Sequence, residues 1–102
     1  MHPSQHHILI VNFTTTSETQ NLALQQVGDN VAEFLSQQAG FVSSRLHASL
    51  DGNSLLHYAE WNSAADFQAA AKIARSHPDL PVLLAYEPSA STYTLRRSFP
   101  EG

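Results

Sequence analysis

The spacing of apolar residues changes several times along the chain, and each change predicts a new element. In four stretches, apolar residues alternate with polar ones or run almost continuously, which indicates strands. In two other stretches they recur at spacings of three and four, which indicates amphipathic helices. The expected order is strand, helix, strand, strand, helix, strand, over residues 6–15, 17–38, 41–50, 54–61, 63–75 and 89–99.

The two middle strands are joined by Asp-Gly at 51–52, a strong signal for a hairpin with a type I′ turn. Closing the hairpin there pairs Leu50 with Asn53 and fixes which residues share a face. One face is mostly apolar and should look toward the core. His57 and Trp61 lie four residues apart on this face, so we expect both to line any pocket. The residues of this face are Val42, Ser44, Leu46, Ala48, Leu55, His57, Ala59 and Trp61.

The first strand is apolar almost throughout, as expected when both of its faces are covered. Alternation places Ile8, Ile10 and Asn12 on one face, and the residues between them on the other. We assign the first set to the pocket side, which makes Ile10 and Asn12 candidate substrate-binding residues. The alternative for Asn12 is a strand-end residue that bonds to local backbone.

The first helix should start at a capping box, formed by Ser17 with Gln20 or by Thr15 with Glu18. Its apolar stripe supplies Phe34 as a further candidate substrate-binding residue. The stripe consists of Leu24, Val27, Val31, Phe34 and Leu35.

The second helix should be capped by Ser63, with Asp66 in its first turn. Its expected buried side supplies Phe67 as the last candidate substrate-binding residue. That side consists of Phe67, Ala70, Ala71 and Ile73.

This order of elements is that of an α+β, ferredoxin-like β-α-β-β-α-β fold, an antiparallel sheet with two helices on one face. We expect a single domain over 1–102, with flexible ends at 1–5 and 100–102. The second face of the sheet should be apolar and uncovered, which predicts a homodimer through that face. Its expected members are Leu9, Val11, Phe13, Leu56, Tyr58, Tyr93 and Leu95.

Composition excludes several classes of function. The net charge is −4 with five Lys plus Arg and no basic patch, which argues against nucleic acid. The absence of cysteine excludes disulfides and thiolate catalysis. No apolar run reaches the roughly 20 residues of a membrane helix, and no signal peptide is evident, so we expect a cytoplasmic protein.

Common catalytic and binding motifs are also missing: there is no GxGxxG, P-loop, GxSxG or HExxH. No two histidines are four apart on a predicted helix, so we expect no metal site. His2, His6 and His7 are expected at the surface.

The pocket residues suggest proton chemistry. A histidine with a near-neutral pKa at position 57 could accept a proton from a phenol or enol. N–H groups of Trp61 and Asn12 could then stabilise the oxyanion. The structural alternatives are that His57 and Trp61 are core residues and that side chains fill the pocket.

Two segments resemble the antibiotic biosynthesis monooxygenase family of dimeric α+β barrels: GFVSSRLHASLDG at 40–52 and HYAEWNSAADF at 57–67. The resemblance implies a homodimer with a ligand cavity between sheet and helices in each subunit. Some members oxidise polycyclic anthrones to quinones with O2 and no cofactor. Trp61 matches the family's pocket tryptophan. Because His57 shares a face with Trp61, we take both as candidate catalytic residues that act on a small aromatic ligand.

The chain departs from the quinone-forming pattern at two positions. His57 stands where those members carry Asn, and Phe67 stands where they carry Tyr. A haem-degrading branch uses a first-strand Asn, a Trp and a second-helix His; Asn12 and Trp61 match, but 63–75 contains no histidine. The alternative function is a dimeric binding or stress-related module without turnover.

Overall fold

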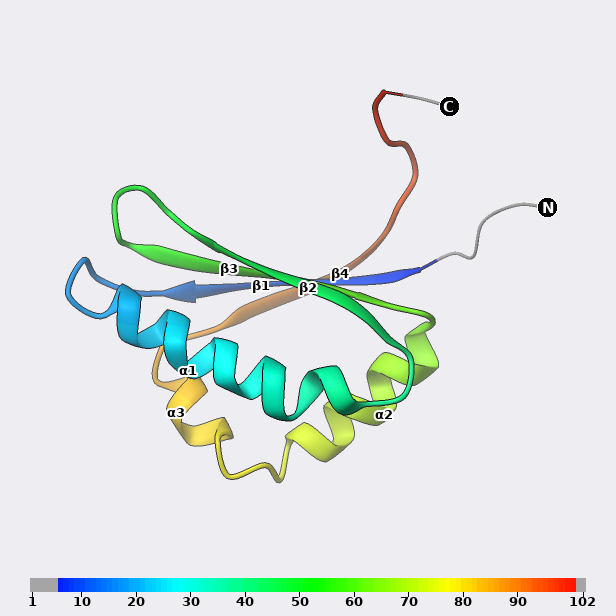
Figure 1. Cartoon of the computed structure of the whole chain (residues 1–102), viewed down its shortest axis with the longest axis horizontal. Helices are drawn as coiled ribbons and strands as arrows, with labels where there is room; N and C mark the ends of the chain where they lie inside the picture. The colour runs from blue at the N-terminus through cyan, green and yellow to red at the C-terminus, as the bar shows by residue number, and fades with distance from the viewer. Residues whose placement is uncertain (1–5, 101–102) are drawn as a thin grey trace.

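The computed structural model describes residues 6–100, and these form one antiparallel sheet with helices packed on one face (Figure 1). The strand order is β2-β3-β1-β4, so the fold is α+β and ferredoxin-like, as predicted. A short third helix, α3, is added before the last strand. The elements are β1 His7–Thr14, α1 Gln20–Glu33, a 3-10 turn Leu35–Gln37, β2 Phe41–Ala48, β3 Ser54–Trp61, α2 Ala64–Ala74, α3 Leu80–Leu84 and β4 Ser89–Thr94.

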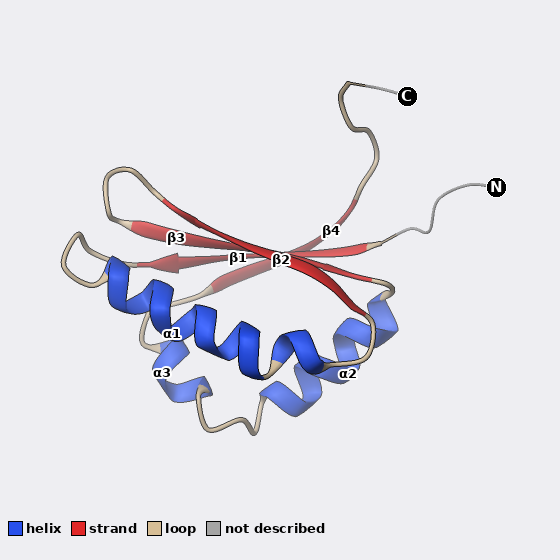
Figure 2. Cartoon of the chain, in the orientation of Figure 1, coloured by secondary structure: helices blue, strands red, loops and turns tan. Residues whose placement is uncertain are grey.

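The sheet of one chain is open, with β2 and β4 at its edges. All three helices lie on the same side of it, and its other face is bare of helices in the described chain (Figure 2). The last strand ends at Thr94, earlier than predicted, and the chain then leaves the sheet on the side away from the helices (Figure 1). The predicted flexible ends fall largely outside the described residues.

The hairpin has the predicted register but a different turn. Ala48 lies opposite Leu55, as it must if Leu50 and Asn53 face each other. The type I′ prediction is wrong, because only Gly52 has a positive φ, of 81°. The Asp51 carboxylate accepts hydrogen bonds from the Asn53 backbone N–H (2.9 Å) and from Ser49 (2.8 Å), and these contacts hold a wider loop.

A β-bulge at the start of β2 changes one predicted face. Phe41 lies opposite Trp61, whereas Ser43 lies opposite Glu60, so Val42 is the extra residue between them. Val42 is therefore 40% exposed instead of facing the core. Phe41 takes the inner place, with its ring 5.4 Å from that of Trp61 in an edge-on contact.

The predicted faces of β1 are inverted. Val11 lies opposite His57, and Asn12 lies opposite Leu56. Leu9, Val11 and Phe13 therefore face the helices, while Asn12 is exposed on the outer face. Both faces of this strand offered apolar residues, so only its pairing with β3 could decide between them.

Neither predicted capping box forms at the first helix. Its N-cap residue is Thr19, whose side chain makes no capping hydrogen bond. In the turn before the helix, the Thr16 backbone N–H donates to the Thr19 hydroxyl at 2.8 Å, and the Thr19 backbone N–H donates to the Thr16 hydroxyl at 3.2 Å. The helix is rotated so that Ala23, Val27 and Asn30 are buried and Leu24 is partly exposed. It ends at Glu33, since Phe34 leaves helical geometry.

The second helix matches its prediction more closely. Ser63 caps it by accepting the Asp66 N–H at 3.1 Å. Ile73, predicted to be buried, is exposed instead. Ala74, one residue further on, lines the space beneath the sheet.

The outer face of the sheet is apolar, as predicted, but the residues on it differ from the predicted set. Leu9, Val11 and Phe13 belong to the inner face. Leu95 lies beyond the end of β4. The outer apolar side chains are Ile8, Ile10, Leu56, Tyr58 and Tyr93. Within residues 6–100, no helix is long and apolar enough to cross a bilayer.

Candidate functional site

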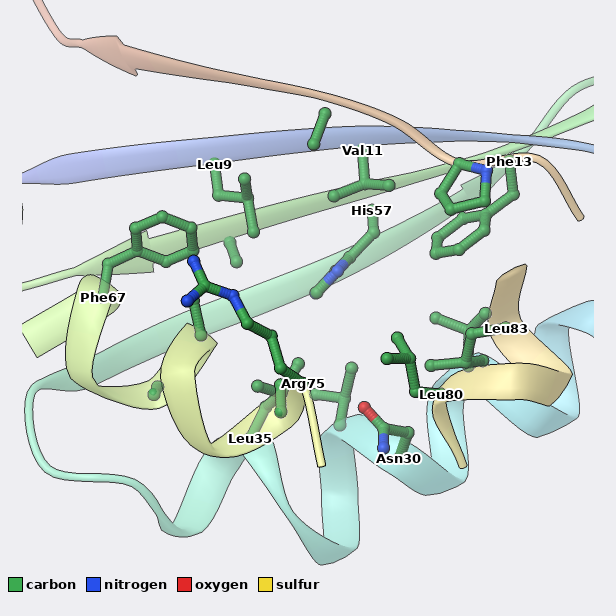
Figure 3. Close-up of a pocket in the computed structure, with 18 of the residues that line it drawn as sticks. Leu9, Val11, Phe13, Asn30, Leu35, His57, Phe67, Arg75, Leu80 and Leu83 are labelled. Atoms are coloured by element: carbon green, nitrogen blue, oxygen red, sulfur yellow. The ribbon is translucent and has the colours of Figure 1, made fainter. Parts of the chain in front are cut away.

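A cavity of about 340 Å³ lies between the inner face of the sheet and the three helices (Figure 3). The interpretation in which side chains fill this space is therefore wrong. The size is within the usual range for small-molecule sites. The cavity is lined almost entirely by carbon: Leu9, Val11, Phe13, Val27, Asn30, Val31, Leu35, His57, Ala59, Trp61, Phe67, Ala70, Ala71, Ala74, Arg75, Leu80, Leu83, Leu84, Pro88 and Ala90.

His57 enters this cavity from the middle of β3. It is only 3% exposed, and its Nε2 is hydrogen-bonded to the hydroxyl of Ser44 on β2. Burial disfavours the imidazolium and lowers the pKa of His57 to about 4. The expected near-neutral pKa is therefore wrong, and His57 is uncharged at pH 7.

Trp61 closes the cavity at the end of β3. It is 1% exposed, and its ring lies edge-on to Phe41 and to Phe67, whose centroid is 6.1 Å away. Its indole N–H is buried with no hydrogen-bond partner. A buried donor left unpaired costs about 1–3 kcal/mol. Within residues 6–100, the indole N–H is therefore a buried donor that lacks an acceptor.

Asn30 and Arg75 also line the cavity, and neither was among the residues predicted for the site. The Asn30 amide N–H donates to the Asp79 carboxylate at 3.2 Å, which leaves its carbonyl oxygen on the cavity side (Figure 3). Asn30 follows Val27 by three positions on the helix, so the apolar stripe itself was a signal for its position. Arg75 follows α2 directly and carried no such signal.

The other predicted site residues divide between the cavity and the rest of the molecule. Phe67 lines the cavity as expected. The expected cavity positions of Asn12 and Ile10 are wrong, because both lie on the outer face. Phe34 is also outside the lining, and its ring packs on that of His77 at 4.5 Å.

His7 is a part-buried neighbour of the site, although it was expected at the surface. It lies opposite Trp61, its ring is 5.1 Å from that of Phe67, and its Nε2 is buried without a hydrogen-bond partner in residues 6–100. His6 is also part-buried and bonds to the Glu60 carboxylate.

The residues expected for the haem-degrading branch do not come together in this cavity. Asn12 points away from the cavity, and the Nδ1 of His77 accepts the Asp79 backbone N–H at 3.0 Å. Across residues 6–100, no three His, Asp or Glu side chains gather as they would around a metal ion.

Fold and cavity together define a small α+β domain that holds an apolar chamber between sheet and helices. The chain belongs to the antibiotic biosynthesis monooxygenase family, whose model matches residues 7–74. It is 34% identical over 68 residues to the tetracenomycin-F1 monooxygenase of Streptomyces glaucescens. That alignment covers 66% of this chain and 61% of the Streptomyces enzyme.

Two solved structures of Streptomyces proteins have the same fold. A monooxygenase from the gene ActVA-Orf6 of Streptomyces coelicolor, in complex with nanaomycin D, is 24% identical with a TM-score of 0.79. The alignment covers 99% of this chain and 96% of that one. SnoaB of Streptomyces nogalater, a cofactor-independent oxygenase, is 23% identical with a TM-score of 0.69, over 95% and 99% of the two chains.

Proposed function

We propose that the protein is a cofactor-independent monooxygenase that oxidises a flat phenolic, quinol or polyketide-type molecule with O2. The observation that carries the proposal is the placement of His57 and Trp61 on the wall of one apolar cavity, with the indole N–H unpartnered. With an anthrone as substrate, the ring CH2 becomes a quinone C=O. One atom of O2 enters the product, and the other leaves as water with the two hydrogens.

His57 is the proposed proton acceptor, and its low pKa sets a condition on that role. A phenol has a pKa near 10, so transfer to an imidazole with a pKa of about 4 costs about 8 kcal/mol for the isolated groups. The attraction between the imidazolium and the new oxyanion offsets part of this cost in a cavity of low polarity. A hydrogen bond from the Trp61 N–H to that oxyanion would lower the cost of proton transfer further.

The apolar lining supports the same chemistry. Most of the cavity wall offers no hydrogen bond to water, so a bound polycyclic molecule would displace solvent at little cost. A deprotonated substrate in such a chamber is separated from water that would reprotonate it. The curated relative, named for tetracenomycin F1, agrees with a substrate of this kind.

Oxygen uptake with an anthrone tests the proposal. We expect His57→Ala and Trp61→Phe each to lower the rate at least tenfold, because each removes a group that contacts the reacting oxygen. Asn12→Ala is the matched control on the outer face and should retain the wild-type rate. Equal rates in wild type, His57→Ala and Trp61→Phe would remove both residues from the mechanism.

A binding module without turnover is the second candidate. It is favoured by Phe67, which lines the cavity with no hydroxyl where quinone-forming members carry Tyr. A quinol or anthrone that raises the melting temperature but is recovered unchanged would support this function over the first.

The outer face of the sheet supports a homodimer as part of either function. Ile10, Leu56, Tyr58 and Tyr93 form an apolar surface that no helix of the described chain covers. Burying such a surface against a second copy is the common solution for a domain of this size.

A further inference from the structure

Arg75 is the single formal positive charge among the described residues that line the cavity, and no acidic side chain lines it. Arg75 follows the last turn of α2, where its backbone N–H bonds to the Ala71 carbonyl. Figure 3 shows its side chain running back along α2 toward Phe67, with the guanidinium on the cavity side. The cation therefore sits beside an apolar chamber.

Arg75 has no ion-pair partner within residues 6–100. The two ion pairs found there join His6 to Glu60 and His77 to Asp79. Since His57 is neutral at pH 7, the lining carries one uncompensated positive charge. The whole chain has a net charge of −4, so any attraction of an anion to this site must be local.

We propose that the ligand of this cavity is an aromatic acid, whose rings fill the apolar chamber and whose carboxylate pairs with Arg75. A guanidinium presents two N–H groups in the geometry of a carboxylate, so it suits this role better than a diffuse surface charge would. Trp61 also lines the cavity, and its buried N–H has no acceptor within residues 6–100. This inference rests on the proposed function, which makes the cavity the substrate site. It adds that the substrate carries a negative charge.

A structural role is the competing explanation for Arg75. A basic residue at the end of a helix interacts favourably with the helix dipole, and its aliphatic stem can cover apolar surface. Lys72, in the last turn of α2, would share such a role; both side chains are exposed, but only Arg75 lines the cavity. The two explanations differ in what they predict for charged and neutral ligands of the same shape.

The test compares anthraquinone-2-carboxylate with anthraquinone-2-carboxamide, which are similar in shape and differ in charge. Binding is followed by quenching of Trp61, the only tryptophan. We expect wild type to bind the acid about tenfold more tightly, a difference of about 1.4 kcal/mol. Arg75→Gln should lose this preference for the acid over the amide, and Lys72→Gln should keep it.

Three results would overturn the inference, and they separate its failure from that of the proposed function. Equal binding of acid and amide by wild type, or an unchanged preference in Arg75→Gln, would overturn the role of Arg75 alone. Failure of both probes to bind would overturn it together with the proposed aromatic site.

Discussion

The hydroxyl of Ser44 on β2 is hydrogen-bonded to Nε2 of His57 on β3, across the strand pair that forms the wall of the cavity. This bond ties one ring nitrogen of the buried histidine to the sheet. The other ring nitrogen, Nδ1, is then the one left for a bound molecule. The orientation of the proposed proton acceptor therefore depends on a residue of the neighbouring strand.

Replacing Ser44 should destabilise the protein. Ser44→Ala leaves a buried ring nitrogen without its partner, so we expect the free energy of unfolding to fall by about 1–3 kcal/mol. Ser43→Ala is the matched control, since Ser43 lies on the opposite face of the same strand, and its effect should stay within about 0.5 kcal/mol. Urea denaturation measures both; equal losses would contradict the importance of this bond.

The stability of the fold should fall in mild acid because of His57. Its pKa is about 4 when folded and about 6.5 when unfolded, so between these values the unfolded chain binds more protons. Its contribution is complete above pH 6.5 and decreases as the pH drops toward 4, by about 3 kcal/mol in total. His57→Gln should flatten this part of the stability profile, whereas His47→Gln, at an exposed position, should leave it unchanged.

Two glycines should respond in opposite directions to alanine. Gly40 has a φ of 85°, and a Cβ there would lie 2.4 Å from the Cβ of Asp66, so Gly40→Ala should cost more than about 2 kcal/mol. Gly28 lies inside α1, where a Cβ would make an ordinary 3.6 Å contact with Leu46, so Gly28→Ala should stabilise by about 0.5–1 kcal/mol. Thermal unfolding of both variants checks the pair, and a loss of stability in Gly28→Ala would contradict the helix geometry.

A charge on the outer face should break the proposed homodimer. Leu56→Asp places a carboxylate at the centre of the apolar outer surface, where a second copy would have to desolvate it. We expect sedimentation to show a dimer for wild type and a monomer with retained helix and strand content for the variant. Leu22→Asp, at an exposed position on α1, is the control and should sediment as wild type does. A monomeric wild type would end this proposal.

Restoring the quinone-forming pattern should increase turnover of an anthrone. Phe67→Tyr adds a hydroxyl to a ring that already lines the cavity, and a positioned acid–base group contributes about 10²–10⁴-fold in favourable cases. We expect an increase of about tenfold in oxygen uptake. An unchanged rate in Phe67→Tyr would indicate that this position does not reach the reacting atoms.

The sequence by itself determined the order of the elements, the register of the β2–β3 hairpin and the Ser63 cap of the second helix. It also carried the family resemblance, and it placed His57 and Trp61 on one face of the hairpin and Phe67 on the buried side of the second helix. These features depend on residues close together in the chain: an Asp-Gly turn fixes its own strand pairing, and a serine caps the helix that follows it. Their physical causes can therefore be read locally.

Only the tertiary structure decided which face of β1 points inward. Both faces of this strand carry apolar residues, so its sequence alone is ambiguous. Pairing with β3 turns Val11 inward and Asn12 outward. The same holds for the bulge at Val42 and for the rotation of α1 that buries Asn30. The low pKa of His57 and the place of Arg75 beside the cavity likewise depend on burial and on packing between elements far apart in sequence. No local pattern encodes such contacts, since they exist only once the sheet and helices have come together.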